Sequence, residues 1–198
     1  MLYKAGRSLC MILLRILFSV KIEGKENIPG TGYILVANHR TNFDPLFVVT
    51  GIRAQVCFMA KVELFQNPLL GWLLKHLGAF PVERGKGDTG AIDWAVDLIR
   101  GGKVLGMFPE GTRSLTGAPQ RPKSGAALIA MQTGADLLPC AVCYGEKLGF
   151  RTKVTVRYGK LIRGEELNFT PGTQSTAEIK AASRLIMDRI IGLLEGKQ

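Results

Sequence analysis

The chain has 198 residues, 46% of them hydrophobic, with ordinary aromatic, Gly and Pro contents, which fits one folded domain and excludes a disordered or fibrous protein. Its 26 Lys and Arg against 16 Asp and Glu give a net charge of +10, which favours nucleic acid, anionic lipid headgroups or acidic and phosphorylated substrates as partners. Four cysteines lie in apolar runs and lack the density of a secreted disulfide framework, so we expect reduced, buried thiols on the cytosolic side. Cys140 and Cys143 have the spacing of half a metal site, but neither a second pair nor a nearby His supports one.

Residues 1–21 are predicted to form an amphipathic helix. Its apolar side chains share one face at helical spacing and its basic residues fall on the opposite side; the apolar set is Leu9, Ile12, Leu13, Ile16, Leu17 and Val20. The uncharged stretch at residues 8–14 is far shorter than the roughly 18 residues that span a bilayer, and Arg15 interrupts the apolar region that a signal peptide would need. A terminal helix packed on the core remains an alternative. Because all four charges before Glu23 are positive, we favour a membrane-associating helix that lies in the plane of the bilayer.

Beyond this helix, short apolar strands alternate with helical segments. Strands are expected at residues 33–37, 56–60, 79–82, 104–108, 137–143 and 154–158. Helices are expected from Asp44 onward and at residues 68–77, 91–100, 124–133 and 176–194, with Asp44 as the N-cap and Pro45 at the first helical position. This alternation predicts a single α/β domain over residues 22–198, in which helices flank a mostly parallel or mixed central sheet.

The first candidate for chemistry is His39, one of only two histidines. The other, His76, lies in an apolar helix, where a packed or surface histidine is expected. His39 follows a strand, and Asp44 comes five residues later, so its carboxylate could curl back, accept the Nδ1 proton and raise the basicity of Nε2. Without a protein nucleophile beside it, such a pair suits deprotonation of a hydroxyl that belongs to the substrate. The alternative is that Asp44 only caps the helix.

The second candidate is Phe108-Pro109-Glu110-Gly111-Thr112-Arg113-Ser114, which follows another apolar strand. In an open α/β sheet, sites form at the carboxyl ends of the strands, where this segment is expected. Gly111 lets the backbone approach a ligand, Thr112 supplies a hydroxyl, and Arg113 offers the planar fork that fits a phosphate. Glu110 could hold Arg113 in place or bond a substrate hydroxyl. A polar surface turn is the alternative.

A third segment, residues 78–87, puts Arg84 and Lys86 after a strand, where both could contact a phosphate. It also contains Gly85-x-Gly87-x-x-Gly90, which matches the dinucleotide-binding pattern. A chain with 24 glycines meets this pattern easily, and the sole acidic residue at a suitable distance, Glu110, belongs to the segment above. We therefore expect no nicotinamide or flavin site here.

Together these segments resemble the glycerolipid acyltransferases, specifically the 1-acylglycerol-3-phosphate (lysophosphatidate) acyltransferases. Residues 38–44 match the family's NHxxxxD block, with Thr41 where Ser is common, and residues 108–114 match its FPEGTRS block without change. Residues 78–84 look like its second block, although Glu83 stands where Asp or Lys is more frequent, and residues 138–142 are similar to its fourth. Lys123 and the following Gly-Ala pair also resemble a basic helix start in this family. The resemblance covers about residues 22–158, and the N-terminus is short for the family.

The resemblance implies a role for each matching residue. His39 would act as general base on the free glycerol hydroxyl, and Asp44 would orient and stabilise it. Arg113, Gly111 and Thr112 would bind the glycerol phosphate, with Arg84 as a second contact, and Glu110 would be structural or substrate-orienting. Pro139, in the fourth block, would lie near the acyl donor or acyl chain. The hydroxyl would attack the thioester of acyl-CoA or acyl carrier protein directly, so neither a metal nor a cofactor is implied.

These expectations describe an enzyme of phospholipid biosynthesis that makes phosphatidic acid at an anionic membrane surface, peripheral or monotopic on the cytoplasmic face. One alternative is a relative that acts on glycerol-3-phosphate, another lysophospholipid or an aminolipid. Another is a non-catalytic membrane-binding domain with the same fold, which the intact His39 and Asp44 argue against. Binding to nucleic acid is not expected, because the basic residues lie in short loops without interleaved stacking aromatics.

Overall fold

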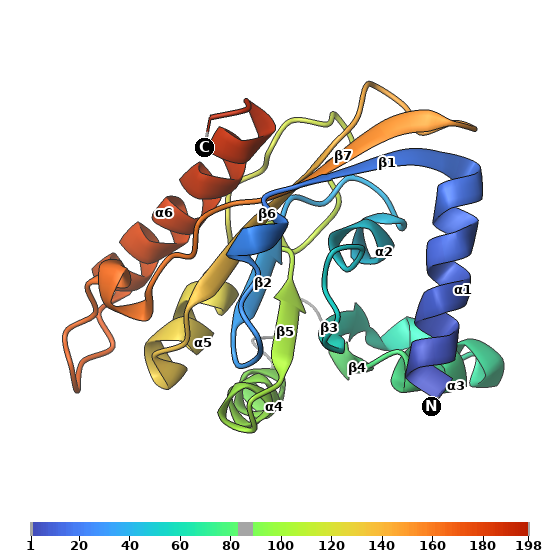
Figure 1. Cartoon of the computed structure of the whole chain (residues 1–198). Helices are drawn as coiled ribbons and strands as arrows, with labels where there is room; N and C mark the ends of the chain where they lie inside the picture. Colours follow the sequence, from blue (N-terminus) through green and yellow to red (C-terminus); the bar gives the residue numbers. More distant parts are fainter. Residues whose placement is uncertain (1, 83–88, 198) are drawn as a thin grey trace.

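A computed structural model of the chain describes residues 2–82 and 89–197. Within these residues, seven strands form one sheet in the order β1-β7-β6-β2-β5-β3-β4 (Figure 1). The strands are β1 (Phe18–Glu23), β2 (Ile34–Ala37), β3 (Val56–Lys61), β4 (Ala79–Val82), β5 (Val104–Met107), β6 (Leu137–Cys143) and β7 (Thr152–Tyr158). β6 and β7 pair antiparallel and all other neighbours pair parallel, so the predicted α/β fold with a mixed central sheet is confirmed.

Helices cover both faces of the sheet. They are α1 (Leu2–Leu17), α2 (Asp44–Val48), α3 (Pro68–His76), α4 (Thr89–Arg100), α5 (Gly125–Thr133) and α6 (Thr176–Leu194), with 3₁₀ helices η1 (Lys25–Asn27), η2 (Val62–Phe65) and η3 (Gly164–Leu167). One core cluster joins the sheet to α4, α5 and α6, and a second joins its other face to α1 and α2 (Figure 1). The wholly buried β2 serves both clusters, because Ile34 and Val36 face the first while Leu35 and Ala37 face the second.

The N-terminal helix is shorter than predicted. It ends at Leu17, and the next residues form β1, so the expectation of a helix over residues 1–21 is wrong for its last part, and Val20 belongs to a strand. From Phe18 onward, apolar and polar residues alternate with period two, which suits a strand with one covered face. The free edge of β7 offers parallel backbone pairing to this segment, and Arg157 on β7 donates a hydrogen bond of 2.8 Å to Glu23. The other predicted strands and helices are present with small shifts at their ends.

Tyr158, the last residue of β7, links α2 to the sheet through its side chain. Its buried hydroxyl donates to the carbonyl of Val48 and accepts from the backbone N–H of Gly51, both at 2.9 Å. A Cβ at Gly51 would lie 2.7 Å from the Tyr158 ring, so only glycine allows this approach. Burial raises the pKa of the Tyr158 hydroxyl, which therefore stays neutral and serves as a hydrogen-bonding group. Since α2 begins at Asp44, this contact helps to position the segment that carries the first candidate site.

Replacing Tyr158 by Phe is expected to lower the free energy of unfolding by about 1–3 kcal/mol, because it leaves two buried backbone groups of the α2 region without a partner. Tyr33 provides a matched control: it is equally buried, and its hydroxyl has no hydrogen-bond partner among the described residues. Tyr33→Phe should change stability little. Denaturant unfolding of both variants measures the difference, and equal losses would contradict this role of Tyr158.

Candidate active site

The loop between β2 and α2 is fastened to the sheet by Asn38. Its side-chain oxygen accepts from the backbone N–H of Val142 at 2.8 Å, and its amide nitrogen donates to the Val142 carbonyl at 3.2 Å. Both bonds reach β6, the neighbour of β2, so the side chain extends the sheet pairing beyond the last residue of the strand. The residue that follows, His39, is therefore held at the carboxyl end of a central strand, where α/β sheets form their sites.

Asp44 organises this loop from within. It is completely buried and accepts from His39 Nδ1 at 2.8 Å, from the backbone N–H of Thr41 at 2.6 Å and from the N–H of Arg40. The Thr41 hydroxyl donates to its second oxygen at 3.0 Å. Asp44 is not the N-cap of α2: that position belongs to Phe43, and the carboxylate turns back to the preceding loop instead of forward to the helix. The capping expectation is thus wrong, and the pairing of His39 with Asp44 is what the folded chain forms.

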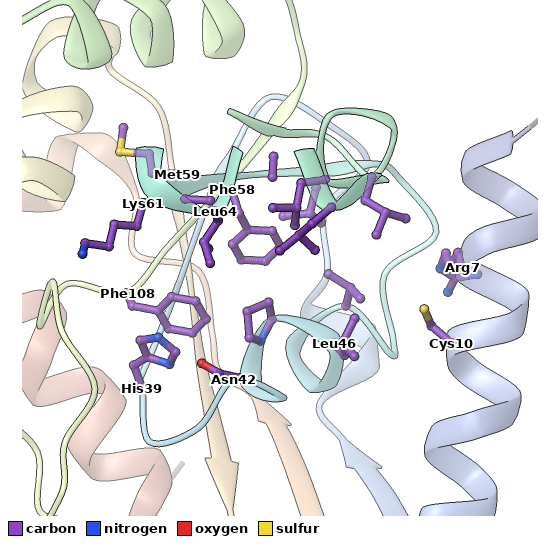
Figure 2. Close-up of a pocket in the computed structure, with 18 of the residues that line it drawn as sticks. Arg7, Cys10, His39, Asn42, Leu46, Phe58, Met59, Lys61, Leu64 and Phe108 are labelled. Carbon is purple, nitrogen blue, oxygen red and sulfur yellow. The ribbon is translucent and has the colours of Figure 1, made fainter. Parts of the chain in front are cut away.

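The His39 ring is mostly buried and has two different sides. It stacks on Phe108 at 4.1 Å between ring centroids, and its Nδ1 is bound to Asp44. An ionised carboxylate at Nδ1 favours the tautomer with the proton on that nitrogen, so Nε2 is left with a lone pair. Within the described part of the chain, Nε2 makes no hydrogen bond, and the ring borders a cavity (Figure 2). This is the arrangement of a general base that is ready to take a proton from a bound molecule.

Glu110 helps to position the backbone of His39. It is buried in the loop that follows β5. One oxygen accepts from the backbone N–H of His39 at 2.8 Å and the other from the N–H of Gln120 at 2.9 Å. A further bond joins the loop after β2 to the loop after β5: the backbone N–H of Ser114 donates to the His39 carbonyl at 2.8 Å. Burial raises the pKa of the Glu110 carboxyl, an effect that the two backbone N–H bonds oppose. Both oxygens are engaged within the protein, which favours a structural role over contact with a substrate.

Arg113 reaches the same region from the opposite loop. Its Nη1 donates to the side-chain oxygen of Asn42 at 3.0 Å, and both residues border the cavity beside His39. Gly111 has a left-handed backbone with φ of 71°, and a Cβ there would lie 2.7 Å from the side chain of Lys123, so this turn requires glycine. Thr112 is exposed, and its hydroxyl lies 3.4 Å from Gln120 Oε1. Of the four residues Glu110 to Arg113, only Arg113 borders the cavity.

The cavity itself has a volume of about 520 Å³ and is mainly apolar. Figure 2 shows His39 and Phe108 on one side of it and Arg7 and Cys10 of α1 on the other. Apart from Asn42, Arg113 and Lys61 of β3, its remaining wall consists of apolar side chains, most of them from α1, α2, β3, η2 and α3, among them Met11, Leu14, Leu46, Val49, Phe58, Leu64, Leu70 and Leu74. An imidazole and a guanidinium thus both border a space that is suited to a hydrocarbon chain. No group of three or more His, Cys, Asp or Glu side chains that could hold a metal ion occurs in residues 2–82 and 89–197.

Comparison with known proteins identifies the family. The model of the family described as Acyltransferase matches residues 19–143, which include both loops of the site. The chain belongs to the acyltransferase family. Over 172 residues it is 34% identical to the 1-acyl-sn-glycerol-3-phosphate acyltransferase of Bacillus subtilis, covering 84% of this chain and 83% of that protein. Over 144 residues it is 35% identical to the enzyme of the same name from Streptococcus pneumoniae, covering 70% of this chain and 53% of that protein.

The fold of this acyltransferase also has a solved counterpart. The crystal structure of the 1-acyl-sn-glycerophosphate acyltransferase PlsC from Thermotoga maritima aligns with a TM-score of 0.75 and 24% sequence identity, covering 98% of this chain and 79% of that one. At this identity the likeness concerns the fold. In the acyltransferase described here, no helix among residues 2–82 and 89–197 has both the length and the hydropathy to cross a membrane.

The family resemblance also assigned Arg84 to the phosphate site and Pro139 to the acyl region. Arg84 lies outside the described residues. Pro139 is buried in β6 and does not border the cavity; a Cβ at Gly159 would meet both its ring and the side chain of Leu193, which belongs to the layer of α6. This layer covers the face of the sheet opposite to α1 and α2.

Conversely, the candidate site includes residues to which the sequence analysis assigned no role. Phe108 supports the His39 ring, and Asn42 holds Arg113. Both lie inside the two recognised blocks, so the sequence could have marked them as candidate site residues. It could not show which residues they contact, because each contact joins segments about 70 residues apart; Asn42 and Arg113, for example, are 71 positions apart.

Proposed function

We propose that this acyltransferase moves an acyl group from acyl-CoA or acyl carrier protein to the free hydroxyl of 1-acyl-glycerol-3-phosphate, which gives phosphatidic acid for phospholipid biosynthesis. The observation that carries the proposal is that His39, which is paired with the buried Asp44, and Arg113 border one apolar cavity. A general base, a phosphate-binding cation and a space for a hydrocarbon chain are the three things that a lysophosphatidate acceptor needs. The names of the Bacillus and Streptococcus relatives support the same acceptor.

In the proposed reaction His39 acts as the general base. Its Nε2 takes the proton of the glycerol hydroxyl while the hydroxyl oxygen forms a bond to the thioester carbonyl carbon. The C–S bond then breaks, and the imidazolium returns the proton to the departing thiolate, so a free thiol and an ester result. Asp44 holds the ring in the correct tautomer and stabilises the imidazolium, an effect strengthened by its complete burial. In this scheme no side chain of the protein accepts the acyl group, and the proposed reaction requires neither a metal nor a redox cofactor.

Arg113 is proposed to bind the phosphate of the acceptor. One of its N–H groups is used on Asn42, which holds the guanidinium beside the cavity and leaves its other donors for phosphate oxygens. Gly111 and Thr112 contribute the turn that carries Arg113 and a hydroxyl next to it, and Arg84 is retained as a second phosphate contact. The apolar wall of the cavity would then take the acyl chain of the acceptor.

The reaction is proposed to take place with α1 attached peripherally to an anionic membrane, at its cytoplasmic face. The apolar face of α1 does not pack on the core: Leu9, Ile12 and Ile16 are each more than half exposed. A terminal helix that only completed the core would bury these side chains, whereas a helix in the plane of the bilayer would place them in lipid.

Replacing Ile12 and Ile16 by Glu should therefore move the protein from the pellet to the supernatant when anionic vesicles are sedimented. Unchanged sedimentation would contradict attachment through α1.

Replacing His39 by Ala should lower the turnover number by about 10²–10⁴-fold, because the proton of the hydroxyl has no other acceptor in the site. Transfer of a labelled acyl group to lysophosphatidate measures this, with acyl-CoA and acyl carrier protein tested as separate donors. The unfolding temperature should fall, because the buried Asp44 loses one of its four hydrogen-bond donors. Lysophosphatidate binding, measured at a temperature at which both proteins are folded, should stay close to that of the wild type, which separates a lost base from a lost fold. Near-normal turnover would overturn the mechanism.

Replacing Arg113 by Ala should raise the apparent KM for lysophosphatidate by roughly 10–100-fold, the ratio expected for losing hydrogen bonds to a charged phosphate. The KM for the acyl donor should not change, and the preference for lysophosphatidate over monoacylglycerol, which lacks the phosphate, should decrease by a similar factor. Arg121→Ala is the matched control, because Arg121 is an exposed arginine in the same loop that does not border the cavity. An unchanged preference in Arg113→Ala would remove this residue from the phosphate site.

A further inference from the structure

A second hollow, separate from the cavity beside His39, lies at the carboxyl ends of three neighbouring strands. It is lined by residues 40–43, 113–117 and 144–148, which belong to the loops after β2, β5 and β6, and its volume is about 1010 Å³. We call it the polar groove. Its volume is at the upper end of the roughly 300–1,000 Å³ that small-molecule sites occupy. The groove therefore has both the size of a binding site and the position in the sheet at which α/β proteins form one.

Arg40 holds the three loops of the polar groove together. Its guanidinium donates to the carbonyls of Tyr144 at 3.0 Å, Gly145 at 3.1 Å and Glu146 at 3.3 Å, and it lies over the Tyr144 ring at 4.1 Å from the centroid. On its other side is Gly117, with φ of 81°, where a Cβ would lie 2.9 Å from Nη2 of the guanidinium. Glycine thus allows the guanidinium to lie against this loop. The residue that follows the proposed base therefore determines the shape of the groove.

The polar groove carries positive charge that the described residues do not neutralise. Arg40, Arg113 and Lys147 border it, and Glu146 is the one acidic residue among the lining ranges given above. None of the three cations forms an ion pair within residues 2–82 and 89–197. Cations that line a concave surface without counter-charges raise the local concentration of anions. The groove is thus suited to an anionic, polar ligand and not to a hydrocarbon chain.

The polar groove adjoins the cavity beside His39. Asn42 and Arg113 border both spaces, and the hydrogen bond of 3.0 Å between their side chains lies where the two meet. In the proposed function the cavity holds the acyl chain of the acceptor, and Arg113 binds its phosphate. The second substrate must bring its thioester to the same hydroxyl, and the groove reaches this point from a side that the acceptor does not occupy.

We propose that the polar groove binds the 4′-phosphopantetheine arm of the acyl donor, with Lys147 on the phosphate of the arm and the thioester at the Asn42–Arg113 pair. This arm is common to acyl-CoA and acyl carrier protein. It is a polar chain with two amides, a phosphate at one end and the sulfur at the other, so its charge and polarity match those of the groove. After acyl transfer the free thiol remains on the arm. The identity of the ligand rests on the proposed function, whereas the anion site rests on the groove alone.

Replacing Lys147 by Ala should raise the KM for the acyl donor by about 3–10-fold, the effect of losing one charged contact at an exposed position. The KM for lysophosphatidate should stay at the wild-type value, and Lys147→Arg should restore the donor KM. Lys147 is exposed, so its loss should leave the fold intact. Lys153→Ala is the matched control, because Lys153 is an exposed lysine of β7 that does not border the groove. A rise in the KM for lysophosphatidate alone would assign the groove to the acceptor and overturn the proposal.

The two donors show which part of the ligand Lys147 contacts. If the contact is with the shared arm, Lys147→Ala should weaken acyl-CoA and acyl carrier protein by similar factors. A change with acyl-CoA alone would place the contact on its nucleotide and overturn the assignment to the arm.

Binding of the arm by itself gives a readout that does not depend on turnover. In equilibrium dialysis with the full-length protein, 4′-phosphopantetheine should bind more tightly than pantetheine, which lacks the phosphate. In Lys147→Ala this difference should shrink by about the factor seen in the donor KM. Equal affinities in the wild type, or no measurable binding of either compound, would overturn the proposal.

The outcomes separate this inference from the proposed function. If the wild-type protein binds 4′-phosphopantetheine through Lys147 but does not acylate lysophosphatidate, the groove is confirmed and the proposed acceptor is wrong. If it acylates lysophosphatidate and Lys147→Ala matches the wild type in every measurement, the proposed function stands and the inference about the groove is wrong.

Discussion

The carboxylate of Asp44 is the group on which the site depends. It is buried without any exposure and accepts hydrogen bonds from the ring of His39 and from two successive backbone N–H groups of the loop before it, with the hydroxyl of Thr41 as a further donor. A buried charge is tolerated only when its hydrogen-bonding capacity is met, so the loop must adopt the one shape that brings these donors together. That shape determines where the His39 ring lies and which of its nitrogens is free. The orientation of the His39 ring thus follows from the need to supply hydrogen-bond donors to the buried Asp44 carboxylate.

A second buried carboxylate, that of Glu110, also contacts His39 but has a different role. Glu110 accepts backbone N–H groups from two loops and contacts no other side chain through these bonds, so it acts as a brace between the segments that carry His39 and Arg113. β2 and β5 are neighbours in the sheet, and the two loops extend from their adjacent carboxyl ends. The two acidic residues of the recognised blocks therefore have distinct roles because of what each of them accepts: one orients the imidazole and the other holds the loops together.

The polar and apolar parts of the site come from different elements. The base, the brace and the guanidinium belong to loops at the carboxyl ends of β2 and β5, whereas the wall of the cavity belongs mainly to α1, α2, β3 and α3. The helices α1 and α3 are apolar on both sides, which joins the cavity to an outer apolar surface. Because the polar and apolar parts are adjacent, one site can bring a substrate hydroxyl to the base and keep a hydrocarbon chain out of water.

The sequence by itself determined the order of most strands and helices, the two loops that match the family's motifs and the pairing of His39 with Asp44. These features are local: helical and strand periods are read over a few residues, and the dyad spans only five positions. Tertiary structure decided that residues 18–23 form β1, because the alternating pattern there could pair only once the edge of β7 was present. It also decided the contacts between Glu110 and His39 and between Asn42 and Arg113, which require β2 and β5 to be neighbours. Above all, it decided that the apolar faces of α1 and α3 point outward, because a periodic pattern defines the faces of a helix but not which of them the rest of the chain will cover.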